Sequence, residues 1–193
     1  MLDASKVLVG TADQTSTGAI LSAPLGTALP TGFADQLNDA FKDSGYVSSD
    51  GLSFTIDDST SDINEWNGSL VRRLLESRDV TFSWSHLETN AESLKNTFGD
   101  ENVVVTQVTE SDGEKITVSI GAKLPAAKSW VFKLKDGAHR ILIVVPNGQI
   151  TSVDEVSFTS SDAITWPVTL STYADEHGHN CYIYFDDGKV KAQ

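Results

Sequence analysis

Apolar and polar residues alternate along four separate segments of this chain, and that period of two constrains its fold more than any other feature. The segments are 80–85, 116–120, 130–135 and 164–170. Successive side chains of an extended strand point to opposite faces, so each segment is typical of a strand with one buried and one wet face. Segments 103–108 and 139–145 are apolar on both sides, as expected of central core strands. The pattern predicts a mainly β protein.

Turn-forming dipeptides separate the expected strands. They are Asp112-Gly113, Asp136-Gly137, Asn147-Gly148 and Asp187-Gly188. An aspartate or asparagine followed by glycine suits a tight hairpin turn, because the favoured turns need a positive φ that these residues tolerate. Pro167 has no backbone N–H to donate, so its strand is expected to lie at a sheet edge or to be bulged there.

One amphipathic helix is expected near residues 89–98. Thr89 and Glu92 have the spacing of a capping box, and Gly99 is suited to end the helix. Its single apolar stripe consists of Ala91, Leu94 and Phe98. A helix with one apolar face is expected to lie against a sheet. A weaker helical pattern covers 33–42, where Phe33, Leu37 and Phe41 recur every four residues.

The first 70 residues differ in composition from the rest of the chain. They are rich in glycine, proline, serine, threonine and aspartate, and short apolar islands interrupt them at 19–21 and 52–56. These islands argue against plain disorder and favour an arm that packs on a neighbouring subunit. The length suits a single domain, in which we divide a loop-rich and arm-rich assembly region, 1–70, from a β core, 71–193.

The chain is strongly acidic, with a formal net charge of −13. Nucleic acid is therefore not expected as a tightly held ligand, because an acidic protein repels phosphate. The charge is uneven: residues 123–140 carry five basic side chains against Asp136, whereas 149–187 carry seven acids and no Lys or Arg. The two blocks are either solvated faces or complementary surfaces through which one subunit meets the next.

No secretory or membrane-spanning segment is expected. The N-terminus lacks a basic region followed by a long apolar stretch. The longest aliphatic run, 141–145, is far too short to cross a bilayer. A single cysteine cannot form an internal disulfide.

The segment 173–181, YADEHGHNC, holds two of the four histidines and the only cysteine. In an extended strand His177, His179 and Cys181 would point to one side and supply three candidate zinc ligands. Gly178 and the flanking strand patterns favour a hairpin loop instead, and a turn would separate the three ligands. We therefore predict a loop and no metal site, with the cysteine as a small core hydrophobe.

Catalytic signatures are absent from the sequence. There is no G-x-S-x-G elbow and no phosphate-binding glycine loop. His86 and His139 lie in or beside strand patterns and are expected to be structural. A chain with 27 acidic residues always contains pairs of carboxylates, so such pairs are no evidence for glycoside cleavage. No enzymatic activity and no cofactor are predicted.

The four tryptophans could form a sugar-stacking platform or belong to the core. Trp84, Trp130 and Trp166 lie in apolar alternation, which favours core packing. Trp66 lies in the polar run INEWNGS and is the exception. It is expected to anchor an interface.

The order of several short motifs resembles a known family over nearly the whole chain. The motifs are Thr17–Ile20, Ala23–Pro30, Gly45–Leu52, Ile63–Gly68, Val71-Arg72, Asp79–Phe82, Leu87–Asn90, Phe98-Gly99, Trp166–Leu170 and Tyr173–Asp175. No single motif is diagnostic, but their order and spacing together are similar to those of the major tail protein, or tail tube protein, of long non-contractile-tailed bacteriophages, especially those of actinobacteria.

This resemblance implies a β-sandwich-like or barrel-like core with one flanking helix. It also implies that six subunits form a ring with joined inner sheets, and that stacked rings form a tube through which the genome passes. The implied partners are further copies of the chain, tail tip and tail terminator proteins, a tape measure protein inside the tube, and double-stranded DNA in transit. The implied location is the virion tail, assembled in the host cytoplasm, and no active-site residue is implied.

Two sets of residues are predicted to serve such an assembly. The interface set is Trp66, Phe54, Arg72, Lys128, Lys133, Lys135 and Arg140. The set expected to face the lumen consists of small polar strand residues: Thr81, Ser83, Thr117, Ser119, Thr165 and Thr169. The alternative is a monomeric β-sandwich binding module, such as a carbohydrate-binding domain, which would bind its ligand through exposed aromatic side chains.

Overall fold

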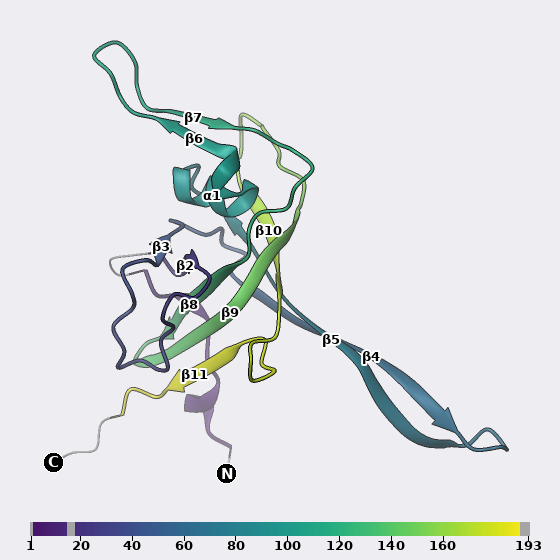
Figure 1. The fold of residues 1–193 in the computed structure, drawn as a ribbon. Helices are drawn as coiled ribbons and strands as arrows, with labels where there is room; N and C mark the ends of the chain where they lie inside the picture. The colour runs from purple at the N-terminus through teal and green to yellow at the C-terminus, as the bar shows by residue number, and fades with distance from the viewer. Residues whose placement is uncertain (1, 15–17, 190–193) are drawn as a thin grey trace.

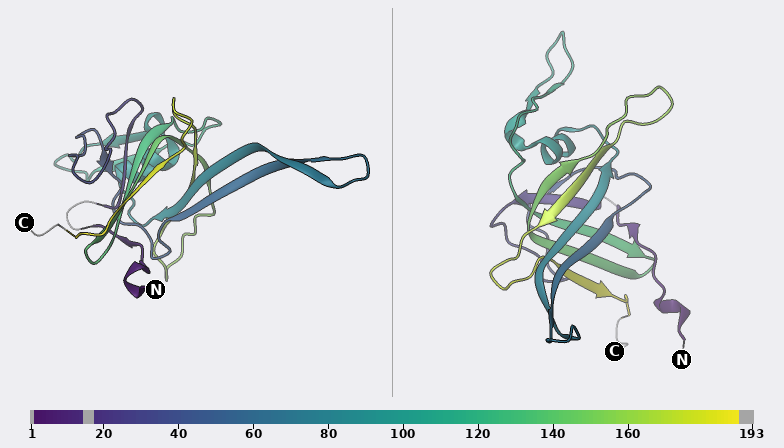
Figure 2. Two further views of the ribbon diagram at one scale, coloured as in Figure 1. Left: turned by 90° about the horizontal axis from the view of Figure 1, so that it is seen from below. Right: turned by 90° about the vertical axis from the view of Figure 1, so that its right-hand side faces the viewer.

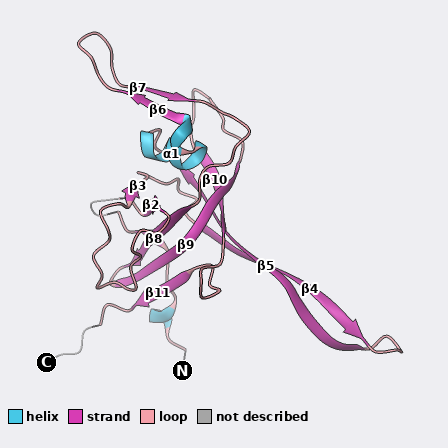
Figure 3. Ribbon diagram, in the orientation of Figure 1, coloured by secondary structure: helices cyan, strands magenta, loops and turns pink. Residues whose placement is uncertain are grey.

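The computed structural model describes residues 2–14 and 18–189, which form a mainly β fold with one α-helix (Figures 1 and 3). The strands of its large antiparallel sheet are β1 (Thr11–Ala12), β2 (Ile20–Pro24), β3 (Lys42–Asp43), β4 (Ser53–Asn64), β5 (Leu70–His86), β8 (Lys128–Asp136), β9 (His139–Val153), β10 (Trp166–Thr172) and β11 (Tyr182–Asp186). The remaining elements are the ribbon strands β6 (Val103–Thr106) and β7 (Lys115–Val118), helix α1 (Ala91–Phe98), and two short 3-10 helices, η1 (Ala4–Lys6) and η2 (Asp100–Asn102).

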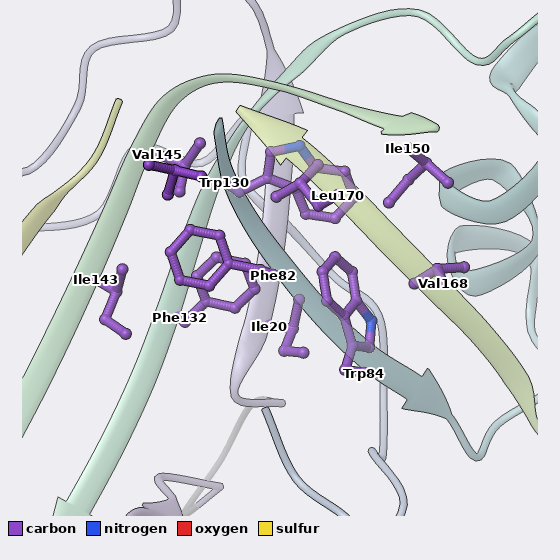
Figure 4. Close-up of a cluster of buried hydrophobic side chains, with 11 residues drawn as sticks. Ile20, Phe82, Trp84, Trp130, Phe132, Ile143, Val145, Ile150, Val168 and Leu170 are labelled. Carbon is purple, nitrogen blue, oxygen red and sulfur yellow. The ribbon is translucent and has the colours of Figure 1, made fainter. Parts of the chain in front are cut away.

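The large sheet curls until its two halves face each other. Its order is β3-β2-β8-β9-β10-β5-β4, with β1 on β8 and β11 on β9. The long strand β9 belongs to both halves, because its first part pairs with β8 and β11 and its last part pairs with β10. The rings of Phe82 on β5 and Phe132 on β8 stack with centroids 5.2 Å apart, and Trp84 meets Trp130 at 5.4 Å (Figure 4). The fold is therefore mainly β and sandwich-like, as the family resemblance implied.

Strand β5 shows the predicted alternation. Val80, Phe82 and Trp84 are buried in the main core, and His86 is buried beyond them. Strand β8 departs from the prediction, because Val131 is buried on the opposite face from Trp130. The expectation of one wet face is therefore wrong for the first half of β8.

A second apolar cluster explains this difference. Its buried members are Leu21, Ala23, Phe41, Val131, Leu142 and Val144. Phe33 and Leu37 pack against it from a segment of turns and bends between β2 and β3. The helix predicted at 33–42 is thus wrong: its apolar residues cover a sheet face from turns and bends, one of which is closed by a hydrogen bond from the Phe41 N–H to the Asn38 carbonyl at 3.0 Å.

Helix α1 confirms the helix predicted near residues 89–98, but its N-cap is Asn90 rather than Thr89. Asn90 is the N-cap: its side chain accepts a hydrogen bond from the Ser93 N–H at 2.8 Å, and the Ser93 hydroxyl accepts from the Asn90 N–H at 3.1 Å. Thr89 instead accepts from the indole N–H of Trp166. Gly99 ends the helix with a φ of 98°, a conformation that favours glycine.

Two other local predictions are wrong. Segment 103–108 is not a central core strand: β6 pairs only with β7 among the described strands, and Val104 and Val108 are 59% and 66% exposed. Asn147-Gly148 is not a turn, because β9 runs through it opposite a register shift in β8. Asp136-Gly137 does form the predicted tight turn between β8 and β9, with Gly137 at a φ of 57°.

Pro167 lies where its missing N–H does not interrupt the β9 ladder. It pairs with Ser85 of β5, whereas pairing with β9 begins at Val168. A register shift follows between Thr169 and Leu170. The Pro167 carbonyl accepts a hydrogen bond from the Asp154 N–H at 3.1 Å, just past the end of β9. The proline therefore lies at the end of this ladder and close to the irregularity, although β10 is not an edge strand.

A long hairpin projects from the body of the molecule (Figures 1 and 2). Strand β5 pairs with β10 only through residues 81–86, whereas residues 70–80 pair with β4 alone among the described strands. We call residues 56–80 the arm. Its strand β4 lies within the part of the chain that the sequence predicts to be rich in loops and arms.

Candidate assembly surface

The arm carries free backbone edges. The outer edge of β4 has no strand partner in the described chain, and the outer edge of β5 has none along residues 70–80. Such an edge presents a row of unpaired N–H and C=O groups that can pair with another chain. A two-stranded ribbon on its own is marginally stable in water, so the arm gains most from a further strand beside it.

One face of the arm continues the main core outward. Phe54 lies at the base of the arm with its ring centroid 4.9 Å from that of Phe82. Ile56 and Leu75 follow along β4 and β5, and about half of each side chain is exposed. The Asp58–Arg78 ion pair lies on the same face, between Ile56 and Leu75. Exposed apolar side chains that adjoin a core are typical of a surface that a partner covers.

Two arginine–aspartate pairs brace the arm. Arg78 donates two hydrogen bonds to Asp58 at 2.6 and 2.7 Å, and Arg73 donates two to Asp62 at 2.7 and 3.1 Å. These bonds lower the pKa of both carboxyls and raise the pKa of both guanidinium groups. Bidentate pairs of this kind fix the relative position of the strands. Arg72, predicted as an interface residue, lies exposed opposite Ile63.

The opposite face of the same strands is polar. In the register of the sheet, Ser53, Ser83 and Thr169 are neighbours across β4, β5 and β10, and the Ser83 and Thr169 hydroxyls are 3.1 Å apart. Further out, Asp57 of β4 lies opposite Asp79 of β5. The face is thus a band of hydroxyl groups that includes one pair of carboxylates, with Ser59 and Ser77 beyond it.

The predicted lumen residues divide into two groups. Thr81, Ser83 and Thr169 lie together on this polar face. Thr165 precedes β10, while Thr117 lies on β7 and Ser119 just after it, outside the large sheet. The structure brings the first three together and leaves the others apart, and Ser53, Thr55, Asp57, Asp79 and Ser171 extend the face beyond the predicted set.

Most of the basic side chains predicted for the interface have partners within their own chain. The Lys128 side chain is largely buried and its Nζ donates to Asn96 Oδ1 at 3.0 Å and to Asp100 Oδ1 at 2.8 Å. On the sheet, Lys135 pairs with Asp13 at 2.9 Å and Lys133 is half-buried beside it on β8.

Arg140 has two partners of its own. It pairs with Asp186, and its guanidinium lies 4.9 Å from the centre of the Phe33 ring. This arginine therefore ties together β9, β11 and the segment between β2 and β3. Because these contacts hold its side chain, Arg140 is less available for a contact with another subunit than an unpaired surface arginine would be.

The histidine-rich segment forms a loop organised by Asp175. Asp175 accepts hydrogen bonds from the backbone N–H groups of His177 and His179, both at 2.9 Å, and from the Tyr182 hydroxyl at 2.6 Å. The Tyr182 hydroxyl bond is the main cause that lowers the pKa of Asp175 to about 2, and the same bond raises the pKa of Tyr182 to about 12. No group of three metal-ligating side chains occurs among the described residues.

The predicted loop is confirmed, but the predicted hairpin is wrong. Strand β11 pairs with β9 rather than with β10, and both strands follow the same edge of β9 one after the other. The loop is an excursion between them. Cys181 packs against the main core, as predicted, and burial raises its pKa.

The tryptophans do not form a sugar-binding platform. Trp84 and Trp130 are buried in the core, and Trp166 is half-buried against Phe98, with ring centroids 5.6 Å apart. Trp66 is fully exposed at the end of the arm. A stacking platform needs aromatic faces side by side, and the four rings do not provide one.

His86 is a structural residue, as predicted. Its Nε2 accepts a hydrogen bond from the indole N–H of Trp84 at 3.1 Å, and its buried Nδ1 has no hydrogen-bond partner in the described part of the chain. Burial lowers the pKa of this histidine to about 4. His139 lies half-buried at the turn between β8 and β9.

The sequence profile of the phage tail tube protein family matches residues 3–192. The chain belongs to this family. It is therefore a structural component of a virion tail. Of the motifs that suggested the family, only the first begins outside the described residues, at Thr17. No curated protein matches the sequence.

Several solved structures share similarity with the tail tube chain at low identity. The tube-terminating cap of the anti-feeding prophage is 12% identical, with 95% of this chain and 99% of that chain covered and a TM-score of 0.45. A chain of the native gene transfer agent virion is 13% identical, with 72% and 88% covered and a TM-score of 0.39. A chain of the sheath–tube complex of an extracellular contractile injection system is 11% identical, with 95% and 99% covered and a TM-score of 0.40.

No helix in the described part of the tail tube protein is long and apolar enough to cross a membrane.

Proposed function

We propose that six copies of this tail tube protein join edge to edge into a ring, and that rings stack into the tail tube. The observation that carries the proposal is the arm, whose outer strand edges have no strand partner among residues 2–14 and 18–189 and whose one face exposes about half of Phe54, Ile56 and Leu75. Pairing each arm with a neighbouring subunit satisfies the backbone groups and covers Phe54, Ile56 and Leu75. Closing the ring leaves no subunit with an unpaired inner edge.

The polar face of β4, β5 and β10 is the surface that lines the tube in this arrangement. It offers hydroxyl groups and the carboxylates of Asp57 and Asp79 to the passing genome. Lys and Arg contacts would hold DNA by releasing counterions from its phosphates. An acidic surface instead repels the duplex over a Debye length of about 8–10 Å and lets it slide.

The tube is then a conduit for genome delivery in a long non-contractile-tailed phage of the actinobacterial type, which the sequence motifs resemble. Its ends would contact the tail tip and tail terminator proteins, and its lumen would hold a tape measure protein before DNA passes. Each of these partners follows from the position of a tube in a tail rather than from a dedicated pocket in this chain.

Electron microscopy of the purified, concentrated protein tests the assembly. Hollow six-fold rings or tubes are expected for the native chain. A shortened variant in which Asn-Gly replaces residues 58–78 keeps Asp57 and Asp79 as the pair flanking a two-residue turn, so the body retains its core. This variant should unfold at nearly the native urea concentration and form no rings. If it still forms rings, pairing through the arm is wrong.

A further inference from the structure

A lysine, an asparagine and an aspartate are in contact between α1 and the start of β8. The Lys128 Nζ donates a hydrogen bond to Asn96 Oδ1 at 3.0 Å and another to Asp100 Oδ1 at 2.8 Å. Asn96 is 1% exposed on the buried side of α1, and only 10% of the Lys128 side chain is exposed. Asp100 begins η2 just after the helix, and more than half of its side chain reaches solvent. The cluster therefore holds an amine, an amide carbonyl and a proton acceptor together.

Two serines fix and polarise the Asn96 amide. The Ser22 hydroxyl on β2 donates to Asn96 Oδ1 at 2.8 Å, and Asn96 Nδ2 donates to Ser44 Oγ at 2.9 Å. Both serines are buried. A donor already in place at a carbonyl oxygen stabilises the negative charge that develops there when a nucleophile attacks the carbon.

The lysine amine is close to the amide carbon. Asn96 Cγ is bonded to Oδ1 at about 1.2 Å, so the Lys128 Nζ, 3.0 Å from Oδ1, lies at most about 4.2 Å from Cγ. Reacting atoms meet at about 3–3.5 Å, so the amine needs to move by about 1 Å. The flexible lysine side chain permits this movement while α1 and β8 stay in place.

Water is kept from the amide but not from the carboxylate. Asn96, Ser22 and Ser44 are each at most 3% exposed, so hydrolysis of the amide does not compete with attack by the lysine. Lys128 and Asp100 line an open hollow of about 500 Å³. A small leaving group released at this cluster can therefore escape to solvent.

We propose that Lys128 and Asn96 join spontaneously in an isopeptide bond. The Lys128 ammonium gives a proton to the Asp100 carboxylate, and the free amine attacks Asn96 Cγ. The Ser22 hydroxyl stabilises the oxyanion that forms at Oδ1. Asp100 then passes its proton to Nδ2 and takes a second proton from Nζ. The Cγ–Nδ2 bond breaks, the new Cγ–Nζ amide remains, and ammonia leaves with the last proton as ammonium. The reaction requires no oxidant, metal or further reactant.

The bond ties the base of the β6–β7 ribbon to the large sheet. It closes the segment 96–128, which contains η2 and the ribbon that projects beyond α1 (Figure 1). A covalent link across such a segment removes conformational freedom from the unfolded chain, as a disulfide does. The reaction takes place within one chain and is independent of ring formation, so it goes beyond the proposed function.

The mass of the intact, purified native chain tests the bond. It should be lower by one ammonia than the mass calculated from the sequence. Trypsin does not cleave after an acylated lysine, so digestion should yield a branched peptide in which 96–115 is joined to 124–133. Tandem mass spectrometry of this peptide should locate the link at Asn96 and Lys128.

Two results overturn the proposal. A native chain at the full calculated mass, with separate peptides 96–115 and 124–128, shows that the cluster serves only to hold the fold together. Loss of ammonia without the branched peptide, together with cleavage by hydroxylamine, indicates a succinimide at Asn67-Gly68 or Asn147-Gly148 instead. The tube function stands in both cases.

Replacing the nucleophile gives a second readout. Lys128→Arg keeps the cation beside Asp100 and removes the amine that attacks. It should have the full calculated mass and a Tm about 10 °C below that of the native chain, as expected for the loss of a covalent link. An unchanged Tm would contradict a link across the segment 96–128.

Replacing the proton acceptor tests the mechanism. Asp100→Asn leaves the amine and the amide in place, and it should slow bond formation in freshly synthesised protein about a hundredfold. Glu101→Gln is the matched control, because this neighbouring acid pairs with Lys123 at 2.7 Å on the surface. It should react at the native rate. Equal rates for Asp100→Asn and Glu101→Gln would overturn the mechanism.

Discussion

At the scale of single residues, His86 makes folding depend on acidity. Its folded pKa of about 4 lies below its ordinary value of 6.5 because burial disfavours the charged ring. Below pH 6.5 the unfolded chain binds a proton at His86 that the folded chain does not bind. The free energy of unfolding therefore decreases as the pH is lowered from 6.5 to about 4. The linked loss reaches about 3 kcal/mol.

Replacing His86 by glutamine should remove this dependence, since the amide keeps an acceptor for the Trp84 indole and does not titrate. Urea unfolding at pH 7.0 and pH 4.5 measures this pH dependence. Between these two pH values the free energy of unfolding should decrease much more for the native chain than for the His86→Gln variant. His139→Gln, at the half-buried turn, serves as the control. Equal losses for the native chain and His86→Gln would contradict the assignment.

The role of Gly148 follows from its packing in the folded chain and cannot be recognised from the sequence. A Cβ at this position would lie 3.0 Å from Leu170 Cδ1 and 3.1 Å from Val145 Cγ1, in the buried core. Gly148→Ala should therefore cost about 1–3 kcal/mol in the free energy of unfolding, as overpacking does. Gly113→Ala meets nothing within 4 Å and should be neutral or slightly stabilising. Equal unfolding free energies for the two variants would show that the strand relaxes around the methyl group.

At the scale of elements, the sequence predicts best the parts that are buried within one chain. Val80, Phe82 and Trp84 alternate because one face of β5 meets the core, and α1 shows its apolar stripe because Leu94 is buried. Strand β4 is exposed along almost its whole length, so its pattern of Asp, Ser and Thr carries no burial signal. A strand that buries little surface within its own chain lacks the full periodicity from which strands are recognised.

The same limit applies to the candidate site. Thr81, Ser83 and Thr169 were expected on one face, and the register of β5 with β10 places them side by side. Thr117 has the same local pattern, yet β7 lies in the separate ribbon. Alternation shows which residues of a strand share a face, but only tertiary pairing decides which sheet that face belongs to. The helix prediction for 33–42 is wrong for a related reason, because apolar residues at every fourth position are also compatible with a loop that covers a sheet.

At the scale of the whole molecule, the net charge of −13 and the polar face are expected to act together on DNA. Asp57 and Asp79 face each other across the arm, so changing both to lysine preserves the like-charge pair and the strain that it imposes on the ribbon. What changes is the sign that the proposed lumen presents to phosphate. Tubes of the Asp57→Lys, Asp79→Lys variant should therefore bind short duplexes at least tenfold more tightly than native tubes.

Cosedimentation of DNA with tubes at 50 and 200 mM salt measures this binding, and the gain should shrink at the higher salt because it arises from counterion release. The control is Glu155→Lys with Asp162→Lys, which changes the net charge equally on the exposed loop near α1. Equal gains from both variants would show that total charge rather than the polar face governs DNA binding. A gain confined to positions 57 and 79 would identify the face of β4 and β5 as the surface that meets the genome, because only there does the same charge act inside a closed ring.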